Sequence, residues 1–171
     1  MDDNLIDGTI GSTITVAVED ANSDDDFDAV ADQTVSVTTT DDDVAGFTIV
    51  ESDGTTSVDE SGTTDTFTIV LDAQPTSDVV LTISSNDTGE TTTTGTLTFS
   101  PVNWDTPQTI TITGVDDDII DGTVTSTITI SVVDASSNDN FDSVADQTVS
   151  ATTADDDVAG FTIVESNGST E

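Results

Sequence analysis

The sequence contains no lysine, arginine, histidine or cysteine. Without cysteine there can be no disulfide bonds, and without histidine or cysteine the usual ligands of transition metals are missing. The many serine and threonine hydroxyls have no histidine or lysine to act as a base for nucleophilic catalysis. We therefore expect that the protein is not an enzyme.

The absence of basic residues also leaves the acidic ones without internal partners. The chain carries 36 acidic residues and a formal net charge of -36. Repulsion on this scale opposes a compact state unless cations or salt compensate it. The same charge repels nucleic acids and anionic membrane surfaces, and no apolar run approaches the ~18 residues of a membrane-spanning helix. We expect neither a nucleic-acid partner nor direct membrane insertion.

A long internal repeat organises the chain. Residues 1–57 align without gaps with residues 115–171, and 40 of the 57 positions are identical. The sequence DDDVAGFTIVES, at residues 41–52, recurs at residues 155–166, an offset of 114 residues. A period of this size indicates an array of domains, because solenoid units are only ~20–50 residues long.

The acidic triplets at residues 41–43 and 155–157 have the character of linkers between repeats. Residues 44–157 are therefore expected to form the complete domain. On this interpretation, residues 1–43 are the C-terminal part of a preceding repeat and residues 158–171 hold the first strand of the next. We expect the natural polypeptide to continue in at least one direction.

The apolar residues of the complete unit recur with a period of two, which is typical of half-buried strands. Seven strands are expected, at residues 45–50, 66–71, 79–84, 97–99, 109–113, 123–133 and 147–153. No apolar stripe of helical period lasts more than one turn. About seven strands in ~110 residues, with regularly spaced turns, predict an all-β, immunoglobulin-like β-sandwich.

Alternating strand directions would bring four acidic segments to the C-terminal end of the domain. Clustered carboxylates repel one another unless a cation lies between them, and calcium prefers six to eight oxygen ligands. The sequence therefore predicts Ca²⁺ as the cofactor. The candidate ligands are Glu51, Asp87 or Glu90, Asp116, Asp117, Asp118, Asp121, Asp155, Asp156 and Asp157, with Asp41, Asp42 and Asp43 in the earlier copy.

A solvated acidic surface, as in halophilic proteins, is the alternative interpretation of these residues. It accounts for the total charge but not for aspartates that come in triplets at the ends of loops.

The unit resembles Calx-beta domains in three segments: FTIVE at residues 47–51, LTFSPVNWDTPQTITITGVDDDIID at 97–121 and TTADDD at 152–157. The resemblance covers residues 44–157 and implies calcium ligands at Glu51, Asp116, Asp117, Asp121 and the triplet 155–157. Asp121 stands where the family usually has glutamate, and the family's Asp–aromatic pair in the middle of the domain is missing. Cadherin-like repeats are a second family with calcium at domain junctions.

These observations predict a calcium-rigidified structural repeat of an extracellular or cell-surface stalk, adhesin or filament. Its partners would be neighbouring repeats of the same polypeptide, with lateral self-association into a fibre as a further variant. The alternative is an adhesive module that contacts glycan, ice or another cell through threonine-rich faces or the loop around Trp104.

Overall fold

The computed structural model describes residues 3–164 and divides the chain into two units, Met1–Val44 and Ala45–Glu171. Residues 158–164 belong to no strand. The rest of the segment 158–171, expected to hold the first strand of a further repeat, lies outside the described residues.

The first unit is a single β-hairpin. Strands β1 (Ile10–Val16) and β2 (Gln33–Thr39) pair antiparallel, from Ile10 opposite Thr39 to Val16 opposite Gln33. The connection between them contains two short 3₁₀ turns, η1 (Asp20–Asn22) and η2 (Asp25–Phe27). Every residue of the two strands is exposed.

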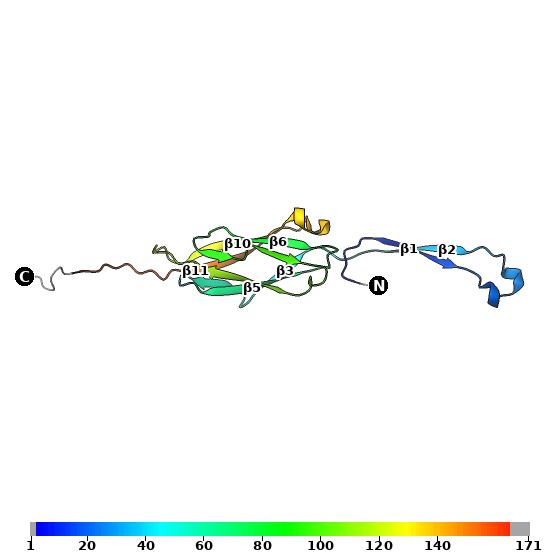
Figure 1. Cartoon of the computed structure of the whole chain (residues 1–171), viewed down its shortest axis with the longest axis horizontal. Helices are drawn as coiled ribbons and strands as arrows, with labels where there is room; N and C mark the ends of the chain where they lie inside the picture. Colours follow the sequence, from blue (N-terminus) through cyan, green and yellow to red (C-terminus); the bar gives the residue numbers. More distant parts are fainter. Residues whose placement is uncertain (1–2, 165–171) are drawn as a thin grey trace, which may run out of the picture. The chain divides into compact units, whose positions relative to one another are not determined.

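The second unit is an immunoglobulin-like β-sandwich of two sheets (Figure 1). The five-stranded sheet has the order β4-β11-β10-β6-β8, and the four-stranded sheet has the order β3-β5-β9-β7. The strands are β3 (Phe47–Glu51), β4 (Thr56–Asp59), β5 (Thr64–Leu71), β6 (Val79–Ser85), β7 (Thr91–Thr93), β8 (Thr96–Phe99), β9 (Gln108–Gly114), β10 (Val124–Val132) and β11 (Gln147–Ala154).

The core lies between the two sheets and follows from the period-two pattern. Phe67 and Ile69 of β5 are buried, while Thr68 between them is only partly covered. Ile128 and Ile130 of β10 face the core in the same way from the other sheet. A β-sandwich buries one face of each sheet, so alternate residues suffice to build its interior.

Each of the seven expected strands has a counterpart among β3, β5, β6, β8, β9, β10 and β11. Strands β4 and β7 were not expected. β7 has the sequence TTT, and β4 has a single apolar residue, Val58. Strands this short, with at most one apolar residue, show no alternation of apolar and polar positions.

The two additional strands leave the strand directions unchanged. Strand β3 is antiparallel to β5, and β5 is antiparallel to β9, so β3 and β9 point the same way. Strand β4 is parallel to β11, and both end where Glu60 N–H donates to the carbonyl of Ala154. The segment from β3 to β4 thus behaves as one strand that changes sheets without reversing, and β7–β8 does the same in the opposite direction.

The described part of the chain includes no helix that is both long enough and apolar enough to cross a membrane.

Candidate metal centre

Four chain segments of the second unit meet at the end where β4, β9 and β11 finish. Glu60 follows β4, and Glu90 precedes β7. The loop from β9 to β10 contains Asp117 and Asp121, and Asp157 lies after β11. The meeting follows from the strand pairing, because the end of β9 lies opposite the start of β7, and the start of β10 lies opposite the end of β11.

Carboxylate oxygens from these segments form two groups of three. In each group the ligand atoms lie within 4.8 Å of one another. One group is Glu60, Glu90 and Asp121, and the other is Glu60, Asp117 and Asp157. We call these five residues the acidic cluster. Glu60 belongs to both groups, so it lies at the centre of the cluster.

The two glutamates of the acidic cluster are buried. Glu60 is 1% exposed and Glu90 is 6% exposed. Among the described residues, no hydrogen-bond donor contacts Oε2 of Glu90 or Oδ2 of Asp157, although both atoms are shielded from solvent. A buried charged group without a partner is costly, so these oxygens require a cation or a proton.

Burial and crowding change the acidity of the cluster. The pKa of Glu60 is raised by its burial, and then by the charges of Asp155, Asp117 and Asp121. The pKa of Glu90 is raised by burial and then by Asp121 and Asp87, among other carboxylates. Burial and neighbouring carboxylates, first Asp118, also raise the pKa of Asp157. The cluster is therefore a site where negative charge is held at a cost.

Asp155 has a different role from its neighbours. Its Oδ2 accepts the backbone N–H of Gly122 at 2.8 Å, and its Oδ1 accepts the backbone N–H of Asp157 at 2.7 Å. These two backbone hydrogen bonds lower the pKa of Asp155. Asp155 thus joins the loop before β10 to the segment after β11 and fixes the positions of the carboxylates on both.

Gly114 allows the two sheets to approach each other beside the cluster. A Cβ atom at this position would collide with the backbone carbonyl of Asp59, and it would crowd Cγ2 of Val58 at 3.3 Å. Since Asp59 is the last residue of β4, the missing side chain of Gly114 lets Glu60 reach the acidic cluster.

The other predicted ligands lie outside the two groups. Oε2 of Glu51 accepts a hydrogen bond from the Thr56 hydroxyl at 2.8 Å. Glu51 pairs with Phe67, and β5 begins three residues earlier, at Thr64. Glu51 therefore lies about 10 Å from the edge of the sheet where the acidic cluster is found. The four-residue β4 covers that remaining distance and brings Glu60 to the cluster instead.

Of the two alternatives Asp87 and Glu90, the structure brings Glu90 into a group. Oδ1 of Asp87 accepts the backbone N–H of Gly89 at 3.1 Å and closes a local turn. Asp116, Asp118 and Asp156 are exposed, and the backbone N–H of Asp156 donates to Oε2 of Glu60 at 3.4 Å.

Glu60 was not among the residues predicted from the sequence. Its signal is the alternation of Thr56, Val58 and Glu60, which are all buried, whereas Ser57 is exposed and Asp59 is partly exposed. An acidic residue at the third inward-facing position of such a run is the feature that identifies it.

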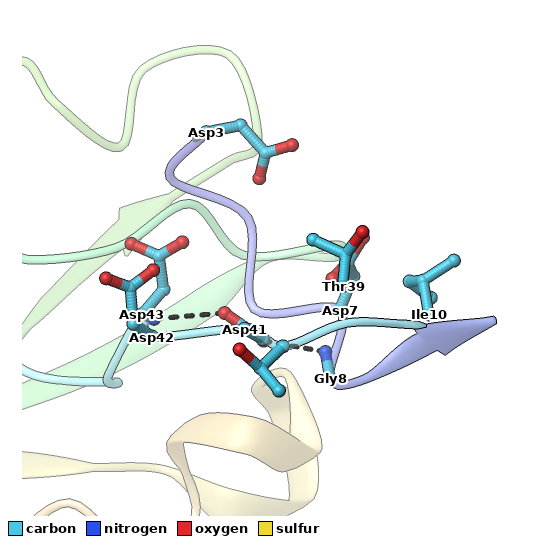
Figure 2. A pocket seen from close by; sticks show the side chains of 9 residues that line it. Asp3, Asp7, Gly8, Ile10, Thr39, Asp41, Asp42 and Asp43 are labelled. Atoms are coloured by element: carbon cyan, nitrogen blue, oxygen red, sulfur yellow. Dashed lines mark hydrogen bonds between the residues drawn. The ribbon is translucent and has the colours of Figure 1, made fainter. Parts of the chain in front are cut away.

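The first unit repeats part of this arrangement (Figure 2). Asp41 accepts the backbone N–H of Gly8 at 2.6 Å and that of Asp43 at 3.0 Å, as Asp155 does at Gly122 and Asp157. These bonds lower the pKa of Asp41. A pocket of about 380 Å³ is lined by Asp3, Asp7, Gly8, Ile10, Thr39, Thr40, Asp41, Asp42 and Asp43.

The loop around Trp104 is tied to the sandwich. The carbonyl of Trp104 accepts the backbone N–H of Leu71 at 3.1 Å, and the residue is partly buried. The carbonyl of Pro101 accepts the side-chain amide of Gln74 at 2.8 Å.

Comparison with known proteins finds no matching family model and no matching curated protein. Among solved structures, the chain is similar to the CBD1 domain of Calx in its apo form, with 16% identity and a TM-score of 0.46, covering 65% of this chain and 98% of that one. It is similar to CBD12 from CALX1.2, with 17% identity and a TM-score of 0.45, covering 64% and 44%. Domains 4 and 5 of the S-layer protein SbsC give 18% identity and a TM-score of 0.42, covering 74% and 54%. These likenesses concern the fold alone.

Proposed function

We propose that the complete repeat binds calcium at the acidic cluster and serves as a structural unit of an extracellular or cell-surface stalk. The observation that carries the proposal is the position of Glu90. Its Oε2 is buried and has no hydrogen-bond donor within the described part of the chain, and its carboxylate lies in one group with Glu60 and Asp121.

A divalent cation suits this cluster better than protons do. A proton neutralises one carboxylate, and the resulting hydroxyl needs an acceptor of its own. An ion within a group compensates two charges and satisfies several oxygens at once. Because Glu60 belongs to both groups, its carboxylate would be shared by two ions.

The donor set favours calcium, because magnesium keeps more water and usually takes only one or two protein carboxylates. All the donors are oxygens, which hard cations prefer. Two ligands of one calcium ion, each at ~2.3–2.6 Å, are separated by at most ~5 Å, whereas magnesium at ~2.0–2.1 Å allows about 4.2 Å. The oxygens of each group lie within 4.8 Å of one another, close enough for a single calcium ion to contact all three.

The ligands come from different parts of the domain. Glu60 extends the five-stranded sheet, Glu90 precedes a strand of the four-stranded sheet, and Asp157 lies on the segment that leaves the sandwich. An ion here would connect both sheets to the exit of the chain. Neighbouring repeats of the same polypeptide are the partners that such a fixed exit would orient.

The proposed location suits a calcium-dependent module. Extracellular calcium modules bind with dissociation constants of about 10⁻⁴–10⁻³ M, which matches the calcium available outside cells. A surface stalk would then be stiff in that medium, and its repeats would loosen if calcium were removed.

The test is thermal unfolding of the chain in calcium and in chelator, together with calcium titration by calorimetry. Calcium should raise the unfolding midpoint, because it binds the folded cluster and not the unfolded chain. Glu60→Gln should abolish most of this increase. The control Glu19→Gln, which changes an exposed residue of the first unit in the same way, should retain it. Equal midpoints with and without calcium would refute the proposal.

A further inference from the structure

The β1–β2 hairpin of the first unit reproduces the β10–β11 hairpin of the second, residue for residue. Its pairs from Ile10–Thr39 to Val16–Gln33 correspond, at the offset of 114, to the pairs from Val124–Thr153 to Ile130–Gln147. The 3₁₀ turns also correspond: Phe27 N–H donates to the carbonyl of Asp24 at 2.9 Å, and Phe141 N–H donates to that of Asn138 at 2.8 Å. The hairpin has therefore the shape that it would have inside a complete sandwich.

The burial of the two hairpins differs completely. Phe141 is 0% exposed and Val149 is 5% exposed, whereas their counterparts Phe27 and Val35 are 59% and 54% exposed. The exposed apolar face of the first unit, which we call the open face, consists of Ile14, Val16, Phe27, Val30, Val35 and Val37. A soluble protein seldom exposes such a contiguous patch unless the patch binds a partner. An isolated two-stranded hairpin is also only marginally stable in water.

The second unit shows what kind of surface covers this face. Strand β4 pairs parallel with β11, strand β6 pairs antiparallel with β10, and the four-stranded sheet closes the core with residues such as Phe67 and Ile110. All of these contributions lie within strands β3–β9. The matching occupant of the open face is therefore a segment with the sequence character of residues 45–114.

The acidic pocket of the first unit is incomplete in the same respect. It contains aspartates equivalent to those at 117, 121 and 155–157. In the second unit, Glu60 and Glu90 both lie within the segment β3–β9. The two glutamates that the pocket lacks would therefore come from an equivalent segment. Completion of the acidic pocket rests on the proposed calcium function, whereas docking at the open face does not.

We infer that the open face of β1–β2 is a docking surface for the β3–β9 segment of another repeat, supplied by the preceding stretch of the same polypeptide. Docking covers the apolar side chains, adds a strand to each edge of the hairpin and brings two glutamates to the acidic pocket. One contact surface thus completes both the core and the metal centre of the first unit.

The test compares the 171-residue chain with an extended chain that has a second copy of residues 44–114 joined in front of Met1. Hydrogen exchange is measured on the peptides that cover β1 and β2, in calcium and in chelator. In the extended chain these amides should exchange at least about tenfold more slowly, approaching the rates of β10 and β11. Equal rates in the two chains, in both media, would overturn the inference.

A matched pair of variants isolates the open face. Val35 lies on this face, whereas Thr34 corresponds to Thr148, which is exposed in the complete sandwich. Val35→Asn should lower the unfolding midpoint of the first unit in the extended chain and have little effect in the 171-residue chain. Thr34→Asn should have little effect in either. Equal effects of the two variants in the extended chain would also overturn the inference.

Two further readouts separate the remaining outcomes. Light scattering should give a monomer for the extended chain, and a dimer would show that the occupant comes from a second molecule, contrary to the inference. If calcium changes no midpoint but Val35→Asn still acts only in the extended chain, the proposed calcium function fails and the docking surface stands. If calcium stabilises the second unit but the extended chain exchanges the amides of β1 and β2 as fast as the 171-residue chain does, the docking surface fails and the calcium function stands.

Discussion

The carboxylate of Asp155 accepts the backbone N–H of Gly122 at 2.8 Å, and Gly122 has a φ of 77° that only glycine adopts easily. The same pair occurs in the first unit, where Asp41 accepts the N–H of Gly8, whose φ is 73°. A turn that requires glycine is thus joined to the exit of the last strand in both copies.

Replacing Gly122 with alanine should destabilise the second unit by roughly 1–2 kcal/mol, because a side chain is strained at this positive φ. The measurement is chemical denaturation in chelator. Gly95→Ala is the control, since Gly95 has an ordinary φ and open space around its Cβ position. Equal losses in the two variants would contradict the role given to the turn.

Asp155→Ala should lower the unfolding midpoint both in calcium and in chelator. The side chain accepts two backbone N–H groups, and these bonds do not depend on an ion. This result would distinguish Asp155 from the acidic cluster, whose substitutions should act in opposite directions in the two media. A loss confined to calcium solutions would assign Asp155 to the ligands instead.

Glu90→Gln should weaken calcium binding at least about tenfold, because it removes a charged ligand from a buried group. In chelator the same variant should be more stable than the parent chain, since an uncompensated buried carboxylate is gone. Calorimetry and thermal unfolding measure the two effects. A variant that loses stability in both media would show that Glu90 has a purely structural role.

The acidic cluster also predicts opposite pH dependences. The pKa values of Glu60 and Glu90 are raised above the ordinary 4.5, so the folded state binds more protons than the unfolded chain between the two values. In chelator, stability should therefore increase as the pH falls from neutrality towards 4.5. In calcium it should decrease over the same range, because protons compete with the ion.

Unfolding midpoints from pH 7 to 4.5 check this prediction, with the double variant Glu60→Gln/Glu90→Gln as the control. The double variant should show a flatter profile in both media. Groups whose pKa is lowered, such as Asp155 and Asp65, lose their contribution only as the pH falls below the ordinary 3.8, outside this range. Profiles with the same slope in calcium and chelator would be incompatible with a metal centre at the cluster.

The two equivalent phenylalanines should respond differently to truncation. Phe141→Ala removes a fully buried ring and should cost roughly 3–5 kcal/mol. In the 171-residue chain Phe27→Ala should cost far less, because Phe27 is exposed. Denaturant unfolding of the two variants gives the comparison, and equal costs would mean that Phe27 is covered in solution.

The sequence predicts the fold well because the core strands have apolar residues at alternate positions, such as Phe67 and Ile69. It does not show β4 or β7, whose backbones join the sheets although β4 has one apolar residue and β7 has none. Glu51 and Glu60 illustrate the consequence for the site. The resemblance to a known family points to the acid at the end of β3, and the extra strand β4 places a different acid at the sheet edge.

The aspartates were easier to anticipate than the glutamates. Residues 116–121 and 155–157 follow long, recognisable strands, so their position at one end of the domain depends only on strand direction. Glu90 precedes a strand of three threonines. Its carboxylate lies in a group with Glu60 and Asp121, and that of Asp87 does not, because their side chains are oriented differently. Orientation of this kind is decided by packing between two sheets, which no local pattern contains.

The parallel pairing of β4 with β11 has a mechanical consequence. The second unit begins with β3, whose start lies at the opposite end from the exit after β11. Tension applied through the polypeptide therefore pulls β11 lengthwise between β10 and β4, which hold it on both edges. Ladder hydrogen bonds lie across the strands, so a lengthwise pull loads them together and does not open them one by one. Such a strand is loaded in shear, and it can leave the sheet only when many of its ladder hydrogen bonds break together.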